Sequence, residues 1–340
     1  MKRRAWRTEK AGRIDRLRLV EETLRPLKID CVRVRVRAAG LNFADIFALT
    51  GLYSATPKGP FIPGLELSGE VMEIGESVTS STIAPGQRVM GCIRFGAYAD
   101  VLDVPASQLQ VIPEEWSFEQ GAAFPVQTLT AWYAVSTLGA VAPGQRVLIH
   151  SAAGGVGLQA MAICRALGAA PIGTVSGQHK KEFLAARGYE QVIVRGAHFA
   201  TQLDELLSGQ PLHLVLDAIG GKVQRQSFDA LAPTGRMVVF GAAEFAPGKN
   251  RPRYASSLWK YMRRPRYDPL SMISANRSVM GFNLIWLWTD QPLFARLMNE
   301  IAALNLDPPH VGKSFPFAEA HAALEHLRSG HSIGKVVLTC

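Results

Sequence analysis

Cysteines and long apolar runs are scarce in this sequence of 340 residues. Its four cysteines, Cys31, Cys92, Cys164 and Cys340, are widely spaced and form no CxxC pair or Cys/His cluster with metal-ligand spacing. A disulfide framework and a structural zinc site are therefore not expected. The longest apolar stretches fall far short of the ~18 residues that span a bilayer, and residues 5–10 do not resemble the apolar core of a signal peptide. We expect a cytoplasmic protein without a transmembrane helix.

Acidic residues are scarce in two segments, which together account for the whole net charge of +9. Residues 1–37 contain 13 Lys+Arg and 5 Asp+Glu, and residues 245–267 contain 7 Lys+Arg and no acidic residue. The rest of the chain has a net charge of −6, so it offers no continuous basic surface for a phosphate backbone. A nucleic-acid partner is therefore not expected.

The order of the predicted elements indicates two domains, and 340 residues with 48% apolar side chains suffice for both. Up to about residue 120, Gly and Pro break short strands, and in Val32–Arg37 the alternation predicts buried valines and solvated arginines. Beyond Trp116, strands alternate with helix-length segments, which indicates a doubly wound parallel sheet of the α/β class. Six strands are predicted there: 146–150, 171–175, 191–194, 212–217, 236–240 and 278–284. The expected domains are 1–120, then 121–289 with an insertion at 244–277, then a return to the first domain over 290–340.

A glycine-rich turn is the most specific motif in the chain. Ser151–Gly157 follows the predicted strand that ends at His150 and precedes a predicted helix. Backbone N–H groups of such a turn approach a pyrophosphate, which also meets the positive end of the helix. We therefore predict that Gly154, Gly155 and Val156 bind a dinucleotide. The alternative is a glycine-rich turn in an α/β domain that binds no nucleotide.

The end of the second predicted strand favours NADP over NAD. NAD sites usually place Asp or Glu there, ~20 residues beyond the glycines. This chain has Ser176 instead, followed by Lys180 and Lys181, so a hydroxyl and two ammonium groups can attract a 2′-phosphate that no carboxylate repels. We predict that Ser176 and Lys180 bind NADPH. In the alternative, the two lysines are only the solvated start of a helix.

Further motifs occur in segments spread along the chain, and together with the glycine turn they are Ala39–Asp45, Gly51–Tyr53, Pro63–Gly69, Pro85–Val89, Ala275–Phe282 and Gly334–Leu338. Through these segments the chain resembles the medium-chain dehydrogenases/reductases from about Val34 to Leu338. Zinc alcohol dehydrogenases of that family have Cys and His where this chain has Asn42 and Leu65, so the chain resembles the zinc-free quinone oxidoreductase branch. Within the branch it is similar to the vesicle amine transport protein subgroup.

The resemblance implies a GroES-like catalytic domain joined to a Rossmann domain that binds NADPH, with no catalytic metal. It implies that Asn42 positions the nicotinamide and contacts the cofactor, and that Tyr53 lies in the same pocket. A neutral phenol can donate a hydrogen bond at neutral pH, so Tyr53 is a candidate donor; in the alternative it only covers the domain. One departure is Val194, where many quinone oxidoreductases have a Tyr near the 2′-phosphate, although the adjacent Arg195 can compensate. Further positions matching the cofactor contacts of the family are Gln127, Thr128, Phe240, Gly241, Ala242 and Phe282.

These observations favour an NADPH-dependent reductase that transfers hydride to a quinone or an α,β-unsaturated carbonyl. The resemblance also implies a homodimer that pairs through residues 279–284. The alternative function is a peripheral membrane or lipid-handling protein that keeps the reductase fold. Residues 245–267 motivate this alternative, because their cations and aromatic residues suit an anionic membrane surface. A solvated lid over the substrate cleft is the other explanation of this segment.

Overall fold

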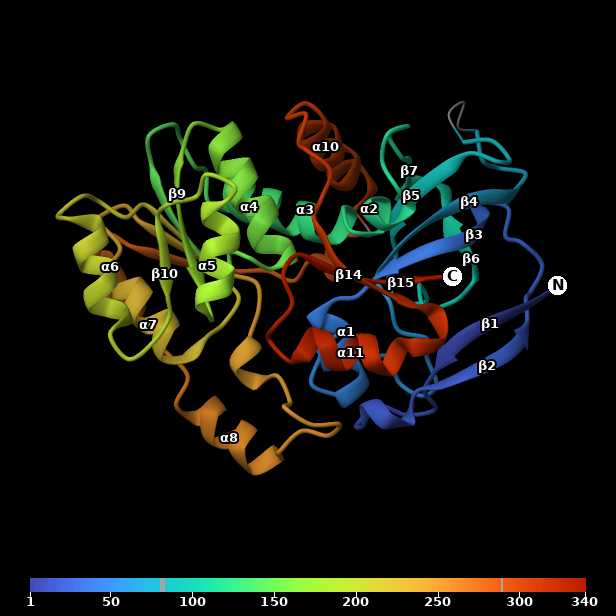
Figure 1. Ribbon diagram of the computed structural model, residues 1–340, viewed down its shortest axis with the longest axis horizontal. Helices are drawn as coiled ribbons and strands as arrows, with labels where there is room; N and C mark the ends of the chain where they lie inside the picture. Colours follow the sequence, from blue (N-terminus) through green and yellow to red (C-terminus); the bar gives the residue numbers. More distant parts are fainter. Residues whose placement is uncertain (80–82, 289) are drawn as a thin grey trace.

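The computed structural model of the protein describes residues 1–79, 83–288 and 290–340. It contains two large sheets, one parallel and one mainly antiparallel, which lie side by side in Figure 1. The predicted domain boundary at residue 289 lies outside the described residues, and the boundary at residue 120 remains a prediction.

The parallel sheet confirms the predicted doubly wound arrangement, with strand order β10-β9-β8-β11-β12-β13. All its pairings are parallel. The last strand is shorter than predicted, because Gly281 pairs with Val239, which is the final residue of the neighbouring strand. Leu284, which was expected in the strand, begins a 3₁₀ turn. The strands are β8 (Arg146–His150), β9 (Ala170–Val175), β10 (Val192–Val194), β11 (Leu214–Asp217), β12 (Arg236–Val239) and β13 (Ser278–Gly281).

Both faces of the parallel sheet are buried, because its strands alternate apolar side chains between two cores. In β8, Val147 and Ile149 enter one core, whereas Leu148 enters the other. The first core is shared with α3 (Pro125–Trp132), α4 (Gly155–Ala166), α5 (Gln178–Ala185) and α10 (Gln291–Ala302); the second is shared with α6 (Phe199–Leu207) and α7 (Gly221–Asp229).

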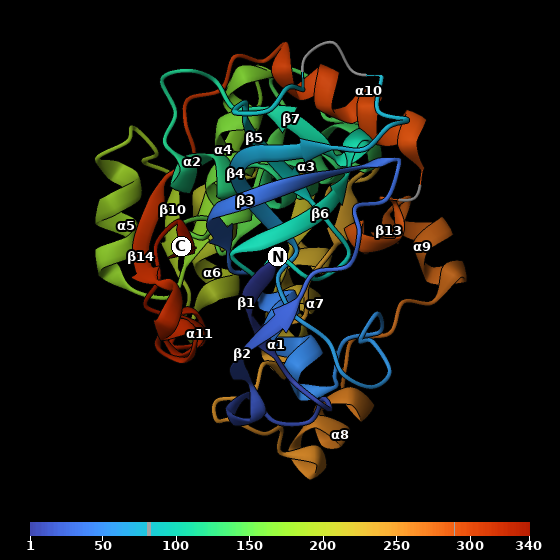
Figure 2. The same cartoon turned by 90° about the vertical axis from the view of Figure 1, so that its right-hand side faces the viewer.

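The second large sheet is formed by both ends of the chain. Strand β15 lies between β14 and β3, so the C-terminal segment pairs with the strands of the first hundred residues. A separate hairpin of β1 (Lys2–Arg7) and β2 (Arg18–Thr23) lies beside it in Figure 2. The sheet contains β3 (Cys31–Gly40), β4 (Glu66–Ile74), β5 (Arg88–Cys92), β6 (Val101–Pro105), β7 (Leu109–Val111), β14 (Val311–Pro316) and β15 (Lys335–Thr339).

Short helices and turns complete this part of the chain. Helices α1 and α11 contact each other beside the second sheet, and α2 packs on β3 and β4. The elements are α1 (Phe43–Thr50), α2 (Phe118–Ala122), α11 (Ala320–Arg328), a π-helical turn at Tyr133–Leu138, and 3₁₀ turns at Ile14–Arg16, Ala106–Gln108, Ala243–Phe245, Leu284–Trp286 and Phe317–Glu319.

The insertion between β12 and β13 forms two helices, α8 (Tyr254–Met262) and α9 (Pro269–Ala275). Its first part contacts the N-terminal region, since Ile14 N donates to Asn250 O over 2.9 Å. Helix α8 projects from the lower edge of the molecule in Figures 1 and 2. The insertion therefore spans from the parallel sheet to the other part of the molecule.

Candidate functional site

The predicted cofactor-binding residues of the second half gather at the carboxyl edge of the parallel sheet. In such sheets, ligands bind beyond the carboxyl ends of the strands. Adjacent strands end in register, as the pairs His150–Thr174 and Val239–Gly281 show. The residues that follow directly are the glycine turn after β8, Ser176 after β9, Phe240, Gly241 and Ala242 after β12, and Phe282 after β13.

The glycine turn leaves no room for a side chain at Gly157, and a side chain at Gly155 would displace the end of Gln127. Helix α4 begins at Gly155, with Gly154 as its extended N-cap residue. A Cβ atom on Gly157 would lie 2.3 Å from the carbonyl oxygen of Ser151, and one on Gly155 would lie 1.9 Å from Oε1 of Gln127. The N–H groups of Gly155 and Val156 belong to the first turn, where helices leave their donors unpaired. This geometry suits a pyrophosphate at the positive end of α4.

Two buried oxygens on α3 need a partner. Oε1 of Gln127 and Oγ1 of Thr128 are buried and have no hydrogen-bond partner among the described residues. Buried polar atoms are nearly always hydrogen-bonded, so an unpaired one beside the glycine turn, such as Oε1 of Gln127, points to a ligand. The amide and hydroxyl groups of a nicotinamide riboside are partners of the right chemistry. The residues around the glycine turn therefore fit a nicotinamide dinucleotide.

Two cations lie near the end of β9, at the position where the sequence predicts the 2′-phosphate. The Lys180 side chain is buried rather than solvated, and its Nζ donates to the Gly330 carbonyl over 2.6 Å. Burial and nearby Arg195 lower the pKa of Lys180. Burial also lowers the pKa of Arg195, an effect that Asp217 opposes. Ser176 is exposed. The interpretation of Lys180 as the solvated start of a helix is therefore wrong.

A buried neutral histidine holds Arg195 through a hydroxyl group. Arg195 donates to Thr174 Oγ1 over 2.9 Å, and Thr174 Oγ1 lies 2.8 Å from Nδ1 of His150. Nε2 of His150 lies 2.9 Å from Ser227 Oγ, which donates to the Val223 carbonyl. These contacts make Nδ1 the acceptor and Nε2 the donor. Burial lowers the pKa of His150 to about 3, so the ring is neutral at pH 7.

Asn42 belongs to a buried charged cluster. Its Oδ1 accepts from Nζ of Lys335 over 2.7 Å, and its Nδ2 donates to Oε1 of Glu66 over 2.9 Å. Lys335 and Glu66 form an ion pair and are 4% and 0% exposed. The other carboxylate oxygen of Glu66 accepts from Val126 N over 2.9 Å, at the first turn of α3. The cluster therefore fixes the orientation of the Asn42 amide and joins it to the helix of Gln127.

Asp45 stabilises the loops around Asn42. Its carboxylate accepts from the N–H groups of Asn42 and Gly64 over 2.8 and 3.0 Å and from the hydroxyl of Tyr98 over 3.0 Å. Complete burial raises the pKa of Asp45 to about 6, although these donors oppose the shift. All of these contacts are internal to the fold, as expected for a structural carboxylate.

Tyr53 faces the parallel-sheet part of the molecule. Its hydroxyl donates to Oδ1 of Asn283 over 2.8 Å, and Asn283 directly follows Phe282. Burial raises the pKa of Tyr53 to about 12, so its phenol is protonated at neutral pH and able to donate. Phe282 in turn contacts Phe240 and Tyr133, with ring centroids 6.1 and 4.9 Å apart. The aromatic side chains thus line the region between Tyr53 and the end of β12.

Sequence reasoning missed Glu66, Lys335 and Asn283 as partners of the predicted residues. Each lies within or directly beside a segment that carries the family resemblance. That proximity is the only signal for them, because the contacts join residues up to 293 positions apart. No periodic pattern reports such a distance.

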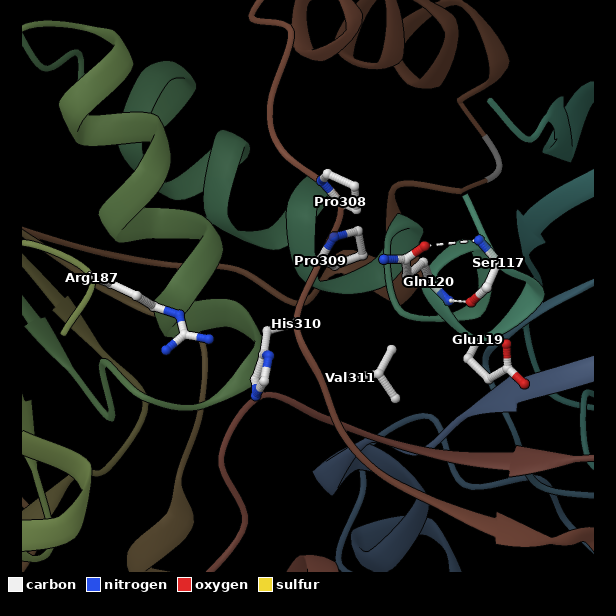
Figure 3. Close-up of a pocket in the computed structure, with 8 residues that line it drawn as sticks. All are labelled: Ser117, Glu119, Gln120, Arg187, Pro308, Pro309, His310 and Val311. Carbon is white, nitrogen blue, oxygen red and sulfur yellow. Dashed lines mark hydrogen bonds between the residues drawn. The ribbon is translucent and has the colours of Figure 1, made fainter. Parts of the chain in front are cut away.

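Another pocket lies apart from these residues. It has a volume of about 520 Å³, and its lining residues, drawn in Figure 3, differ from all the predicted site residues. Ser117 and Gln120 are occupied there with reciprocal hydrogen bonds of 2.8 and 3.2 Å that cap α2. The cavity is lined by Ser117, Glu119, Gln120, Arg187, Pro308, Pro309, His310 and Val311.

The fold and the residues at the carboxyl edge of the parallel sheet define an oxidoreductase built on a dinucleotide-binding domain. Residues 28–114 match the alcohol dehydrogenase GroES-like domain, and residues 155–285 match a zinc-binding dehydrogenase domain. The human synaptic vesicle membrane protein VAT-1 homolog is 32% identical over 312 residues, which cover 90% of this chain and 78% of that protein. The chain belongs to the medium-chain dehydrogenase/reductase family, in its zinc-free quinone oxidoreductase branch near the VAT-1 homologues.

Solved structures agree with this assignment. The quinone oxidoreductase of Thermus thermophilus, which was also solved in complex with NADPH, is 31% identical, with a TM-score of 0.81 over 99% of this chain and 100% of that chain. CurK enoyl reductase is 26% identical, with a TM-score of 0.83 over 99% of each chain. The predicted combination of a GroES-like and a Rossmann domain is thus confirmed.

Although one matching domain is described as zinc-binding, the two positions used for metal in the zinc enzymes have other roles here. Asn42 is held by Glu66 and Lys335, and Leu65 is buried in the apolar core. Across residues 1–79, 83–288 and 290–340, no group of three or more His, Cys, Asp or Glu has a geometry suited to a metal ion. In the same ranges, no helix is long and apolar enough to cross a membrane.

Proposed function

We propose that the protein is a zinc-independent, NADPH-dependent reductase of quinones or α,β-unsaturated carbonyl compounds. The observation that carries this proposal is the unpaired buried oxygen Oε1 of Gln127 on α3, which lies beside Gly155 of the glycine turn at the edge of the parallel sheet. The NADPH complex of the Thermus thermophilus quinone oxidoreductase supports the choice of cofactor. That enzyme and CurK enoyl reductase support the choice of substrate class.

Each end of the cofactor would be held by a different set of residues. The N–H groups of Gly155 and Val156 would hold the pyrophosphate, and Thr128 and Gln127 would hold the nicotinamide half, beside the side chain of Asn42. At the other end, Lys180, Arg195 and Ser176 would hold the 2′-phosphate. A dianion suits this end, because two partly buried cations with lowered pKa values repel each other until an anion lies between them.

NADPH, when bound, supplies a hydride, so the substrate gains that hydride and one proton while the nicotinamide is oxidised. Negative charge then develops on the substrate oxygen and needs a donor. Tyr53 is the proposed donor, because its partly buried phenol stays protonated. It would transfer its hydrogen bond from Asn283 to the substrate oxygen. Asn42 is the proposed positioning residue for the nicotinamide. The aromatic residues Phe240 and Phe282, whose rings contact each other, would limit the access of water to the nicotinamide.

The first experiment is a titration of the purified protein with NADPH and NADH, followed by NADPH oxidation with a panel of quinones and enones. Selective NADPH binding with turnover is the expected result. Tyr53→Phe should then lower kcat at least tenfold while leaving the NADPH dissociation constant unchanged. No binding of either nucleotide would overturn the proposal.

The 2′-phosphate site is tested with two neighbouring lysines. Lys180→Met should weaken NADPH binding about tenfold and leave NADH binding unchanged, because it removes a charge-assisted contact. Lys181→Met is the matched control and should change neither constant by more than about twofold. An NADPH dissociation constant unaffected by Lys180→Met would remove this residue from the site.

The insertion supports a second, weaker candidate, which is reversible contact with an anionic membrane surface. Leu258, Trp259, Tyr261 and Met262 of α8 are each more than half exposed, among seven cations in residues 245–267. Each cation contributes ~1 kcal/mol near such a surface. Co-sedimentation with anionic liposomes at low salt is expected under this candidate, and failure to sediment would exclude it.

A homodimer that pairs through β13, an edge strand of the parallel sheet, is also proposed. A monomeric mass by light scattering would exclude the homodimer.

A further inference from the structure

A pocket of about 280 Å³ opens beside Tyr53 and is lined by both parts of the molecule. The loop of residues 54–57, which follows α1, forms one wall, the turn at Arg94 and Phe95 forms another, and Trp286 forms the third. The hydrogen bond that Tyr53 donates to Asn283 also joins the N-terminal part of the chain to the segment that follows β13. Nδ2 of Asn283 lies 3.4 Å from Ser54 Oγ. The pocket is therefore adjacent to the proposed proton or hydrogen-bond donor.

The turn that carries Arg94 is held in a strained conformation. Phe95 has φ of +97°, a left-handed value that a bulky aromatic residue rarely adopts. Its ring contacts Phe61 and Tyr53 edge-on, with centroids 5.7 and 6.5 Å apart. Such strain persists only where the surroundings fix it, and it concentrates at ligand-binding sites. The backbone of Arg94 is therefore pre-positioned at the pocket.

Arg94 is exposed, and no carboxylate among the described residues neutralises its charge. Elsewhere on the same sheet, Arg33 and Arg37 pair with carboxylates over 2.8 Å. Arg94 has no ion pair within the described part of the chain; its guanidinium instead lies 4.5 Å from the ring centroid of Trp286. The other lining residues of the pocket are Ser54, Ala55, Thr56, Pro57 and Phe95, so the wall contains a cation, hydroxyls and aromatic rings without an acid.

We propose that this pocket binds an anionic group on the substrate. The substrate would be a quinone or enone whose conjugated system carries a carboxylate or a sulfonate. A guanidinium binds such a group through two parallel hydrogen bonds, and the ring of Phe95 would contact the planar conjugated part. This inference rests on the proposed reductase function, because it names the substrate class of the same site.

The test compares two substrates that differ by one anionic group, 1,2-naphthoquinone and 1,2-naphthoquinone-4-sulfonate. Arg94→Met should raise KM for the sulfonate about tenfold more than KM for the neutral quinone, and leave the NADPH dissociation constant within about twofold. Arg94→Lys should recover part of the loss, because it keeps the charge without the planar fork. Arg35→Met, at an exposed position on β3, is the control for the change in net charge. Equal changes for both quinones, or no change for either, would overturn the inference.

A binding measurement separates this inference from the proposed function. Calorimetric titration with the sulfonated quinone, in the absence of NADPH, should show binding that weakens with salt and is lost in Arg94→Met. If the protein binds neither nucleotide, the reductase proposal fails, but the calorimetric result still decides about the pocket. Equal binding by the wild type and Arg94→Met would overturn the anionic site even in an active enzyme.

Discussion

Two buried polar clusters flank the glycine turn, and they differ in charge: one contains an ion pair, and the other is built around a neutral histidine. At the nicotinamide end, Glu66 and Lys335 are both charged and form an ion pair within the core. At the phosphate end, His150 is kept neutral by burial, and Thr174 and Ser227 satisfy both of its nitrogens. A buried ion pair is expensive to break, whereas a neutral chain of hydrogen bonds loses less when one member is removed.

The difference corresponds to what each cluster holds. The charged cluster holds the uncharged amide of Asn42 and the first turn of α3, so its own charges must cancel. The neutral cluster holds Arg195, which is a cation. A protonated His150 next to it would add repulsion, because Arg195 already lowers the pKa of the imidazole. The charges within the first cluster cancel, and the second cluster carries no charge of its own beside Arg195.

The largest expected effect comes from breaking the ion pair. Lys335→Met leaves the fully buried carboxylate of Glu66 without its cation and should lower the free energy of unfolding by about 3–5 kcal/mol. Urea denaturation measures the change. The double variant Glu66→Gln with Lys335→Met removes both charges and should be more stable than Lys335→Met alone.

A second ion pair on the same sheet provides the control. Arg33→Met also removes a buried cation, but its partners Asp103 and Glu73 are 23% and 55% exposed and can be hydrated. Its cost should therefore be about 1–2 kcal/mol. Equal losses for Arg33→Met and Lys335→Met would mean that burial of Glu66 does not set the cost.

Removing His150 should have a smaller effect at neutral pH. His150→Gln loses at least one of two buried hydrogen bonds and should lower the free energy of unfolding by about 1–3 kcal/mol at pH 7. The free energy of unfolding at lower pH tests the neutral imidazole more directly, because histidine takes up a proton there and glutamine does not.

The pH dependence follows from the direction of the shift. The pKa of His150 is about 3 in the folded protein, against 6.5 for the model group, so the unfolded chain takes up the proton first. The contribution of His150 is complete above pH 6.5 and is lost as the pH falls, by up to ~1.4 kcal/mol per unit. The stability advantage of the wild type over His150→Gln should therefore shrink by about 2 kcal/mol between pH 7 and pH 5. A constant difference across that range would contradict a buried neutral imidazole, and His213→Gln, at a partly exposed histidine, should show a smaller change.

Local features of this molecule could be predicted from the sequence, whereas long-range partners could not. The glycine turn and the strands of the parallel sheet are short-range patterns. The turn and all six strands lie at the predicted places in the chain, although β13 ends at Gly281 instead of residue 284. The valine alternation in β3 correctly predicted a strand, but the solvated arginine face was wrong at Arg33, which is 7% exposed. Its register partners, Glu73 on β4 and Asp103 on β6, bury and neutralise it. Register is set by the assembled sheet, so the strand sequence alone does not contain it.

The candidate site divides in the same way. The resemblance to the family led to Asn42, but the reason for its fixed orientation lies on β15, at the far end of the chain. The position of Lys180 next to Ser176 suggested a phosphate ligand, but its burial depends on the loop at Gly330. Both contacts form only because the C-terminal segment returns to the first sheet and meets the glycine turn, where Gly334 N donates to Ala153 O over 2.8 Å.

The smallest expected effect concerns the single hydroxyl that connects His150 to Arg195. Thr174→Val keeps the shape of the side chain and the backbone carbonyl, to which Arg195 also donates over 3.2 Å, but removes the bond to Oγ1. Such a bond contributes about 0.5–1.5 kcal/mol, so the ratio of NADH to NADPH dissociation constants should fall about two- to tenfold. Thr50→Val, which removes an equally buried hydroxyl from α1, should lower stability without changing that ratio. If both variants leave the ratio unchanged, the neutral cluster does not orient Arg195, and only the charged cluster is coupled to the cofactor.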